Sequence, residues 1–325
     1  MELQAFGLIN WLVLGAYLCA NIVLGFVLSK KVTTADDFFV GQRNIPWWAI
    51  GISVVATYVS ALSFLGGPAW AYTEGLSVIA IHLNYPLVIF IVVAFFLPFF
   101  FNSGVASIYE YLEKRFGPTS RSLIAAIFLV SQTLTSAAVL YATALVLEFI
   151  TGMPVIYAII IITLIALIYT IMGGLAAVIW TDVIQAFILL IGALIITVSL
   201  INNLSLPLGE TLEILKTEGK TNPLNFSFDT TQVSTVWTGV IAMTLFHITV
   251  YGANQMMVQR TLASKNIGDA KKSFLMMGYF AILIYFLFFL LGILFYSYYG
   301  GRDFDNGNTI ILDFASSLAI PGLMG

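Results

Sequence analysis

An apolar stretch with a break in its middle constrains this chain most. Residues 52–72, ISVVATYVSALSFLGGPAWAY, are long enough to cross a bilayer as a helix. Ser60 and Ser63 lie near the centre of this stretch, and Gly66, Gly67 and Pro68 follow them. Proline removes a backbone donor and clashes with the preceding turn, and glycine lowers the cost of leaving helical geometry. A broken helix is tolerated at bilayer depth only inside protein or beside a water-filled cavity, so we expect residues 60–68 to be unwound there.

The composition excludes an ordinary soluble domain. Apolar residues make up 60% of the chain and charged residues only 9%, whereas about a quarter of the residues in a soluble domain are charged. The single cysteine, Cys19, rules out an internal disulfide, and two histidines argue against a zinc site. No P-loop, GxSxG or HExxH pattern is present, which argues against a nucleotide-driven pump and against an enzyme. We therefore expect an all-α polytopic membrane protein.

Windows of about 20 apolar residues predict about eight transmembrane helices. We also expect short helices near residues 107–118, 208–216 and 308–319. The eight expected spans cover residues 6–28, 45–72, 76–100, 122–150, 155–172, 176–200, 234–258 and 273–299.

Lysine and arginine are divided unequally between the two sets of connections. Ten of the thirteen follow spans one, three and seven, and the remaining three (Lys216, Lys220 and Arg302) lie in the other connections. Because cytoplasmic loops carry the excess of positive charge, this pattern predicts an N-terminus on the outside.

A second interrupted span indicates an inverted repeat. Residues 246–255, FHITVYGANQ, combine a glycine with two amide side chains at mid-membrane, and we expect residues 247–255 to be unwound. This seventh span crosses in the opposite direction to the second and lies five spans later. Two broken helices at corresponding places in two inverted halves are typical of secondary transporters.

Few polar side chains lie within the spans. Asp182 is the only carboxylate clearly inside one, and it indicates an ion path unless it is wetted at headgroup level. Ser60 and Ser63, together with the carbonyls of Ala56 and Val59, offer the oxygen ligands that a small hard cation prefers. The alternative for the serines is a hydrogen bond to a carbonyl one turn back.

Four further side chains are candidates for contact with a solute. His82 lies in the third span, where a packing role is the commoner one, and His247 lies beside the second break. Asn254 and Gln255 follow His247, and they would otherwise satisfy the interrupted backbone. We expect most of the aromatic residues to face lipid or the membrane interface.

Four segments make the chain resemble the sodium:solute symporter family, which includes carriers of glucose, pantothenate, sialic acid and monocarboxylates. They are DDFFVGQRNIPWWAIGIS, ATYVSALSFLGGPAWAY, YTIMGGLAAVIWTDVIQ and GANQMMVQRTLASK. The resemblance implies a LeuT-type fold, with an extra first helix (1–31), a first five-helix repeat (45–201) and the start of a second, inverted repeat (234–325). It also implies sodium on the carbonyls of Ala56 and Val59.

The resemblance carries further roles residue by residue. It places Asp182 on a second sodium path and turns Ser60, Ser63, His82 and His247 toward the substrate. Sugar carriers have glutamine, glutamate and asparagine where this chain has Ser63, His82 and His247. Sialic acid carriers have an arginine where this chain has Thr135. Family members are usually longer, and we expect this chain to be a fragment or a truncated product whose LeuT-type fold is incomplete.

The sequence thus predicts sodium-coupled symport of a small organic solute by alternating access. The solute would be a sugar, a sialic acid, a monocarboxylate or a vitamin-like compound, Na+ would be the co-transported ion, and no organic cofactor or nucleic acid is expected. The expected location is a plasma membrane, in bacteria the inner one. Two alternatives remain at this point: a passive channel or facilitator, and a transporter-like sensor or subunit that does not transport.

Overall fold

We describe the fold from a computed structural model, in residues 6–30, 32–105, 107–229, 231–318 and 320–325. Regular structure in this part of the chain is helical, apart from one isolated bridge that pairs Ile45 with Ser264. The all-α class expected from the composition is therefore confirmed. The division into an extra helix and two repeats stays a prediction, and residues 1–5 and 31 of that extra helix lie outside the described part.

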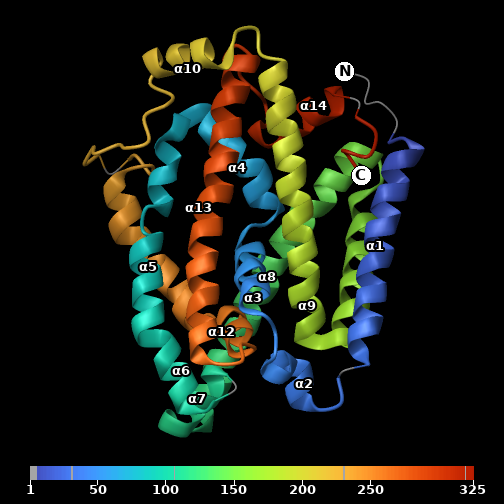
Figure 1. The fold of residues 1–325 in the computed structure, drawn as a ribbon, viewed down its shortest axis with the longest axis vertical. Coiled ribbons are helices and arrows are strands. Elements are labelled where there is room, and N and C mark those ends of the chain that lie inside the picture. The colour runs from blue at the N-terminus through green and yellow to red at the C-terminus, as the bar shows by residue number, and fades with distance from the viewer. Residues whose placement is uncertain (1–5, 31, 106, 230, 319) are drawn as a thin grey trace.

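Five helical stretches are long and apolar enough to cross a membrane, and two shorter apolar stretches accompany them (Figure 1). The long ones are α1 (Leu8–Ser29), Ala61–Ser103, α8 (Pro118–Thr151), α9 (Val155–Asn202) and α13 (Ile267–Tyr298); the shorter ones are α3 (Trp47–Tyr58) and Thr238–Ala253.

Two of the long stretches hold more than one expected span. Ala61–Ser103 comprises α4 (Ala61–Glu74), η2 (Gly75–His82), α5 (Tyr85–Ile91), η3 (Val92–Phe96) and α6 (Leu97–Ser103). It therefore contains the second half of the second span and all of the third. The 48 residues of α9 contain the fifth and sixth spans.

A glycine separates the fifth span from the sixth. Gly174 has φ 57° and ψ −151°, a conformation that L-residues with a side chain rarely adopt. A Cβ atom at Gly174 would lie only 2.6 Å from the carbonyl oxygen of Phe38. Phe38 belongs to α2 (Ala35–Val40), so the missing side chain lets α2 pack against the bend in α9.

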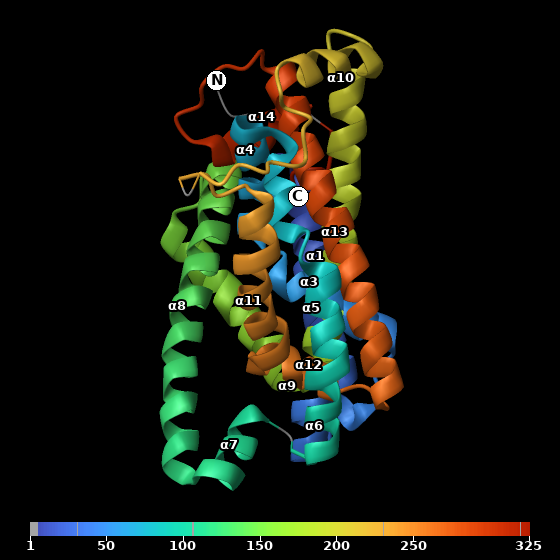
Figure 2. The ribbon, with the colours of Figure 1, turned by 90° about the vertical axis from the view of Figure 1, so that its left-hand side faces the viewer.

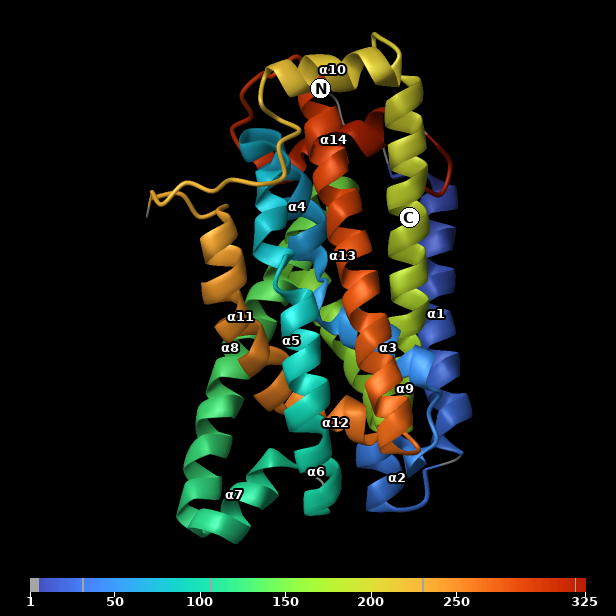
Figure 3. The same ribbon diagram turned by 60° about the vertical axis from the view of Figure 1, so that its left-hand side comes forward.

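The predicted short helices are present as α7 (Ile108–Phe116), α10 (Leu208–Thr217) and α14 (Ile310–Ser317), the last preceded by η6 (Gly307–Thr309). In Figures 1 and 3, α10 and α14 lie at one end of the molecule. The other end carries α2, η1 (Gly41–Arg43), α7 and α12 (Gln255–Leu262). The connections rich in lysine and arginine are thus at the end opposite to α10; we call this basic end the lower end.

In Figure 1 the helix α13 runs down the middle of the view, and Figure 2 shows α8 and α13 on opposite sides of the molecule. Contacts between α13 and the pair α3 and α4 are among the most extensive between any two parts of the described structure. Of the residues of α8, only Ala144 is buried. Both halves of the second span are therefore held by α13, and the first half, α3, also packs against α9.

Candidate functional site

The second span breaks at Val59 and Ser60. Both residues are extended, with ψ angles of 101° and 178°, and they separate α3 from α4. The backbone amide of Ser60 lies 3.4 Å from Oγ of Ser63, instead of bonding to the carbonyl of Ala56 one turn back. The carbonyls just before the break are thereby released from the helical ladder, as oxygen ligands for a cation would have to be.

The expectation that residues 60–68 are unwound is wrong for most of that stretch. The helix resumes at Ala61, and Pro68 lies inside α4. Gly67 serves packing, because a Cβ atom there would lie 3.2 Å from Cβ of Phe288 on α13. Proline costs the helix one hydrogen bond, which alone does not unwind a turn that is held by its neighbours.

The seventh span is also interrupted more narrowly than expected. His247 still belongs to α11 (Met243–Ile248), which follows the wide turn η4 (Thr238–Ala242). Another wide turn, η5 (Thr249–Ala253), follows α11, and only Asn254 is extended. Wide helical turns of this kind are frequent at functional sites. The predicted unwinding of residues 247–255 is therefore confirmed at Asn254 alone.

A cavity of about 310 Å³ adjoins the first break. It lies between the break, α8, α9 and α13, and both Ala56 and Val59 line it. Gln185 of α9 also lines the cavity, and its amide nitrogen donates to the phenol oxygen of Tyr17 at 2.7 Å. The two carbonyl residues predicted to bind sodium thus border a space large enough for a hydrated ion.

Both histidines lie in one buried aromatic cluster, which we call the histidine cluster. The ring of His82 stacks on Tyr285 with 3.8 Å between centroids, and the ring of His247 stacks on Tyr85 at 5.1 Å. Within the described residues, none of the salt bridges involves this cluster. The histidine cluster consists of Tyr58, His82, Tyr85, His247, Tyr251 and Tyr285.

Hydrogen bonds connect the histidine cluster to the first break. Tyr58, the last residue of α3, has its phenol oxygen 3.2 Å from Nε2 of His247. Oγ of Ser63 lies 3.4 Å from the phenol oxygen of Tyr285. Nδ1 of His82 is buried and has no hydrogen-bond partner among the described residues. The structure therefore brings Ser63, His82 and His247 together, as a shared binding site would require.

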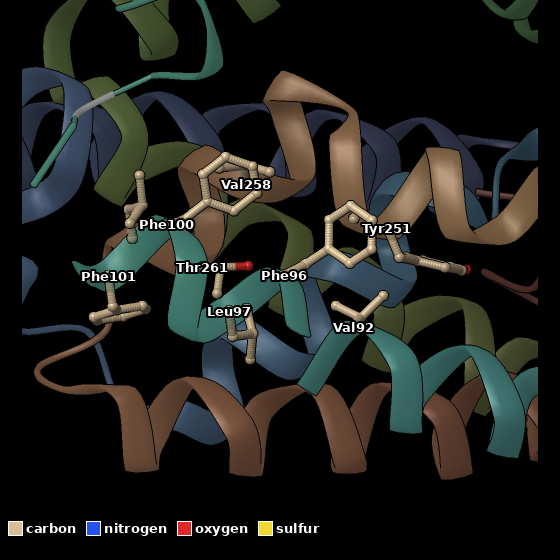
Figure 4. A pocket seen from close by; sticks show the side chains of 10 residues that line it. Val92, Phe96, Leu97, Phe100, Phe101, Tyr251, Val258 and Thr261 are labelled. Carbon is tan, nitrogen blue, oxygen red and sulfur yellow. The ribbon is translucent and has the colours of Figure 1, made fainter. Parts of the chain in front are cut away.

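A small apolar pocket lies between the third and seventh spans, and Tyr251 of the histidine cluster is one of its lining residues (Figure 4). Figure 4 shows Phe96 and Phe100 on one wall and Tyr251 and Val258 on the other. Its volume is about 10 Å³, which is about one water molecule. No solute can pass through this pocket as it stands.

Asp182 is paired with an arginine. Its Oδ2 accepts hydrogen bonds from Oγ of Ser53 at 2.6 Å and from Nη2 of Arg260 at 3.2 Å. Nε of Arg260 also donates to Oγ of Ser53 at 3.0 Å, and both charged side chains are at most 15% exposed. This arrangement joins α9, α3 and α12. A sodium ion at Asp182 would have to share this carboxylate with Arg260 or displace it.

Asn254 and Gln255 have local structural contacts. The side chain of Asn254 accepts from the backbone amide of Met256 at 2.9 Å and caps α12. Oε1 of Gln255 accepts from the backbone amide of Ile108, the first residue of α7, at 3.0 Å. These contacts favour the alternative in which both amides satisfy an interrupted backbone, and their role toward a solute stays a prediction.

The match with a known family covers most of the chain. Residues 38–324 match the model of the sodium:solute symporter family. The chain belongs to this family. The membership predicted from the four sequence segments is thereby confirmed.

Individual symporters are similar over nearly the same range. The chain is 34% identical over 305 residues to the sodium/sialic acid symporter SiaT of Proteus mirabilis (strain HI4320), covering 92% of this chain and 60% of the relative. It is 32% identical over 305 residues to the sodium/glucose cotransporter of Vibrio parahaemolyticus, covering 88% and 54%. The chain therefore spans little more than half the length of these symporters.

A solved structure of a Na+-coupled sialic acid symporter, in a substrate-bound outward-open state, has the same fold. The TM-score is 0.90 at 31% identity, over 98% of this chain and 69% of that one. The LeuT-type fold expected for this member of the symporter family is thus confirmed, and the chain is a multi-pass membrane protein.

Sequence reasoning missed several residues of the site. Tyr85, Tyr251 and Tyr285 are fully or almost fully buried, although we expected aromatic residues to face lipid. The residue type alone does not tell whether a tyrosine in an apolar span faces lipid or protein. Only Tyr251 had a local signal of burial, which was the polar residues next to it in the sequence. Arg260 lies in a basic connection, and nothing local indicates that its guanidinium turns back toward Asp182 in another span.

Proposed function

We propose that the protein is a sodium-coupled symporter that moves a small organic solute across the cytoplasmic membrane by alternating access. The observation that carries this proposal is the break at Val59 and Ser60, which lies between a cavity and the histidine cluster. Freed carbonyls on one side and a buried polar cluster on the other are what a shared ion and solute site needs. Relatives that couple solute movement to sodium support it.

In this proposal, Na+ binds to the carbonyls of Ala56 and Val59. The released carbonyl dipoles supply the oxygen ligands that hard cations prefer. Asp182 is proposed as a ligand of a second sodium ion. That ion can bind to Asp182 only if the carboxylate interacts with the ion and with Arg260 at the same time. Sodium binding at the break stabilises one arrangement of α3 and α4.

The solute occupies the region between the second, third and seventh spans. Ser60, Ser63, His82 and His247 are proposed as its contacts, and Asn254 and Gln255 as contacts further toward the lower end. Stacked rings and hydroxyl groups suit a sugar, a sialic acid, a monocarboxylate or a vitamin-like compound. The small volume of the pocket beside Tyr251 supports a state that is closed toward the lower end.

We further propose that the lower end faces the cytoplasm and that the chain starts on the outside. The excess of lysine and arginine at this end supports that orientation. The proposed location is the inner membrane of a bacterium, and the lipid bilayer is the one macroscopic partner that the long apolar helices require.

The test is uptake by the full-length protein in proteoliposomes, with an inward gradient of sodium or of choline. N-acetylneuraminate, glucose and lactate are the solutes, and empty liposomes are the control. We expect one of these solutes to accumulate only with the sodium gradient. Equal uptake in sodium and choline would instead indicate a passive facilitator, and sodium-dependent binding without uptake would indicate a sensor.

A further inference from the structure

Three polar side chains form a hydrogen-bonded chain across three spans. Tyr58 ends α3 in the second span, Asn84 lies between η2 and α5 in the third, and His247 lies on α11 in the seventh. Nδ2 of Asn84 is 2.8 Å from Nδ1 of His247, and Nε2 of His247 is 3.2 Å from the phenol oxygen of Tyr58. We call Tyr58, His247 and Asn84 the relay.

The relay has a direction, because an amide nitrogen can only donate. Asn84 therefore donates to Nδ1 of His247, and we assign the proton of the neutral ring to Nε2. Nε2–H then donates to the oxygen of Tyr58, which leaves the phenol hydrogen of Tyr58 available to another acceptor. The other end of the relay, Oδ1 of Asn84, is buried and has no hydrogen-bond partner among the described residues.

Packing holds the middle of the relay in place. His247 is fully buried and Asn84 is 1% exposed. The ring of His247 stacks on Tyr85 at 5.1 Å and meets the ring of Tyr58 edge-on at 5.6 Å. A ring that is clamped between two others transmits a shift of one hydrogen-bond partner to the other, because it has little freedom to turn.

The backbone of Tyr58 lies between the two carbonyl residues of the proposed sodium site, Ala56 and Val59. Both of these residues line the cavity, whereas the side chain of Tyr58 reaches the histidine cluster. Tyr58 therefore links the two sites: its backbone lies within the proposed sodium site, and its side chain belongs to the histidine cluster.

We propose that Tyr58 is a positioning residue that couples sodium to the solute through His247 and Asn84. The inference rests on the proposed function. An ion that fixes the carbonyls of Ala56 and Val59 also fixes Tyr58, and Tyr58 fixes the ring that faces the solute. Coupling is reciprocal, so bound solute strengthens sodium binding by the same factor.

The first experiment measures the coupling factor in the full-length protein. For the solute that is moved in the uptake assay, this factor is the ratio of the apparent affinities in saturating and in low sodium. We expect Tyr58→Phe to lower the factor by about tenfold, equivalent to about 1.4 kcal/mol, because a single hydrogen bond is lost. Tyr72→Phe is the matched control, since its phenol also makes one hydrogen bond, to the carbonyl of Arg302 at 2.7 Å, but lies outside the histidine cluster, and the factor should stay unchanged.

The second experiment needs no solute. The ring nitrogens are read by labelling the protein with ¹⁵N-histidine, and the signals of His247 are assigned by their loss in His247→Gln. We expect Nε2 of His247 to carry the proton and its signal to shift when NaCl replaces choline chloride. The shift should vanish in Tyr58→Phe and persist in Tyr72→Phe.

The inference is overturned by a proton on Nδ1, by the absence of a sodium-induced shift, or by a Tyr58→Phe variant that couples as the wild type does. Uptake that depends on sodium in the wild type, with unchanged coupling in Tyr58→Phe, removes the inference and leaves the proposed function standing. Uptake without sodium dependence in the wild type removes both. If Tyr58→Phe does not fold, the coupling factor of His247→Gln decides instead, and the same tenfold loss is expected.

Discussion

At the scale of single residues, glycine and proline in this chain have uses that their local sequence does not reveal. Gly66, Gly67 and Pro68 indicate an unwound segment to a reader of the sequence, yet all three are helical. A glycine allows either an unwound backbone or the close approach of another helix, and the sequence does not distinguish the two. In this protein Gly67 allows the close approach. The partner of that approach is on α13, more than 200 residues away, which no local pattern contains.

Gly292 provides the first prediction at this scale. A Cβ atom at Gly292 would collide with the carbonyl oxygen of Pro68 and would lie 2.7 Å from Cβ of Ala71. Because the nearest atom is backbone, α13 and α4 must move apart to admit a methyl group. We expect Gly292→Ala to lower the free energy of unfolding by about 1–3 kcal/mol, as overpacking does, which thermal denaturation in detergent measures.

The matched control is Gly192→Ala in α9, where nothing lies within 4 Å of the added Cβ. Alanine is favoured over glycine in a helix by about 1 kcal/mol, so this control should be neutral or slightly stabilising. Equal melting temperatures for the two variants would contradict the packing explanation.

At the scale of helices, the sequence predicted where the spans lie but not where each break falls. The apolar windows, the short helices at 107–118, 208–216 and 308–319, and the bend near Gly174 follow from hydropathy and glycine placement, and the structure contains all of them. The break itself falls at Val59 and Ser60, where the one local signal is that serine is a preferred N-cap residue. It is set by the neighbouring helices, which hold the two halves of the span at fixed positions.

The ion pair between Asp182 and Arg260 is expected to hold α9, α3 and α12 together, which gives a second prediction. Removing Arg260 leaves a buried carboxylate without its partner, and breaking such a pair costs about 3–5 kcal/mol. We expect Arg260→Met to destabilise the protein by this order, measured by thermal denaturation. The double variant Arg260→Met/Asp182→Leu should recover most of the loss, because it removes both buried charges.

Lys114→Ala is the control for this pair. Lys114 and Glu110 form an ion pair at 2.7 Å on α7, where the lysine side chain is 57% exposed. A surface pair contributes only about 0–1 kcal/mol, so its loss should hardly change the melting temperature. A double variant as unstable as Arg260→Met alone would show that the ion pair is not what joins these helices.

At the scale of the whole molecule, the candidate site assembles from spans that are remote in sequence. The sequence identified Ser63, His82 and His247 through family resemblance, and the structure brings them into one region. It did not identify Tyr58, Tyr85 or Tyr285, because residue type alone does not distinguish a tyrosine that faces lipid from one that faces a buried ring. Contacts between spans decide that distinction.

The lower end of the molecule is closed by contacts between the start of the second span and the end of the seventh. The backbone amide of Ile45 lies 3.4 Å from the carbonyl oxygen of Ala263, and Ile45 and Ser264 form the isolated bridge. Nε2 of Gln259 donates to the carbonyl of Phe39 at 2.7 Å. If alternating access opens the lower end, these contacts must separate during each cycle.

A disulfide between positions 45 and 264 should therefore arrest transport. Paired extended segments lie about 4.8 Å apart, within the range of about 4.4–6.8 Å between Cα atoms that a disulfide needs. We expect Ile45→Cys/Ser264→Cys, made with Cys19→Ala to remove the only native cysteine, to lose nearly all uptake on oxidation and to regain it with dithiothreitol. Each single cysteine variant is the control and should be insensitive to oxidant. Full uptake by protein whose cross-link is verified by mass spectrometry would contradict this prediction. It would show that the lower end stays closed throughout the transport cycle.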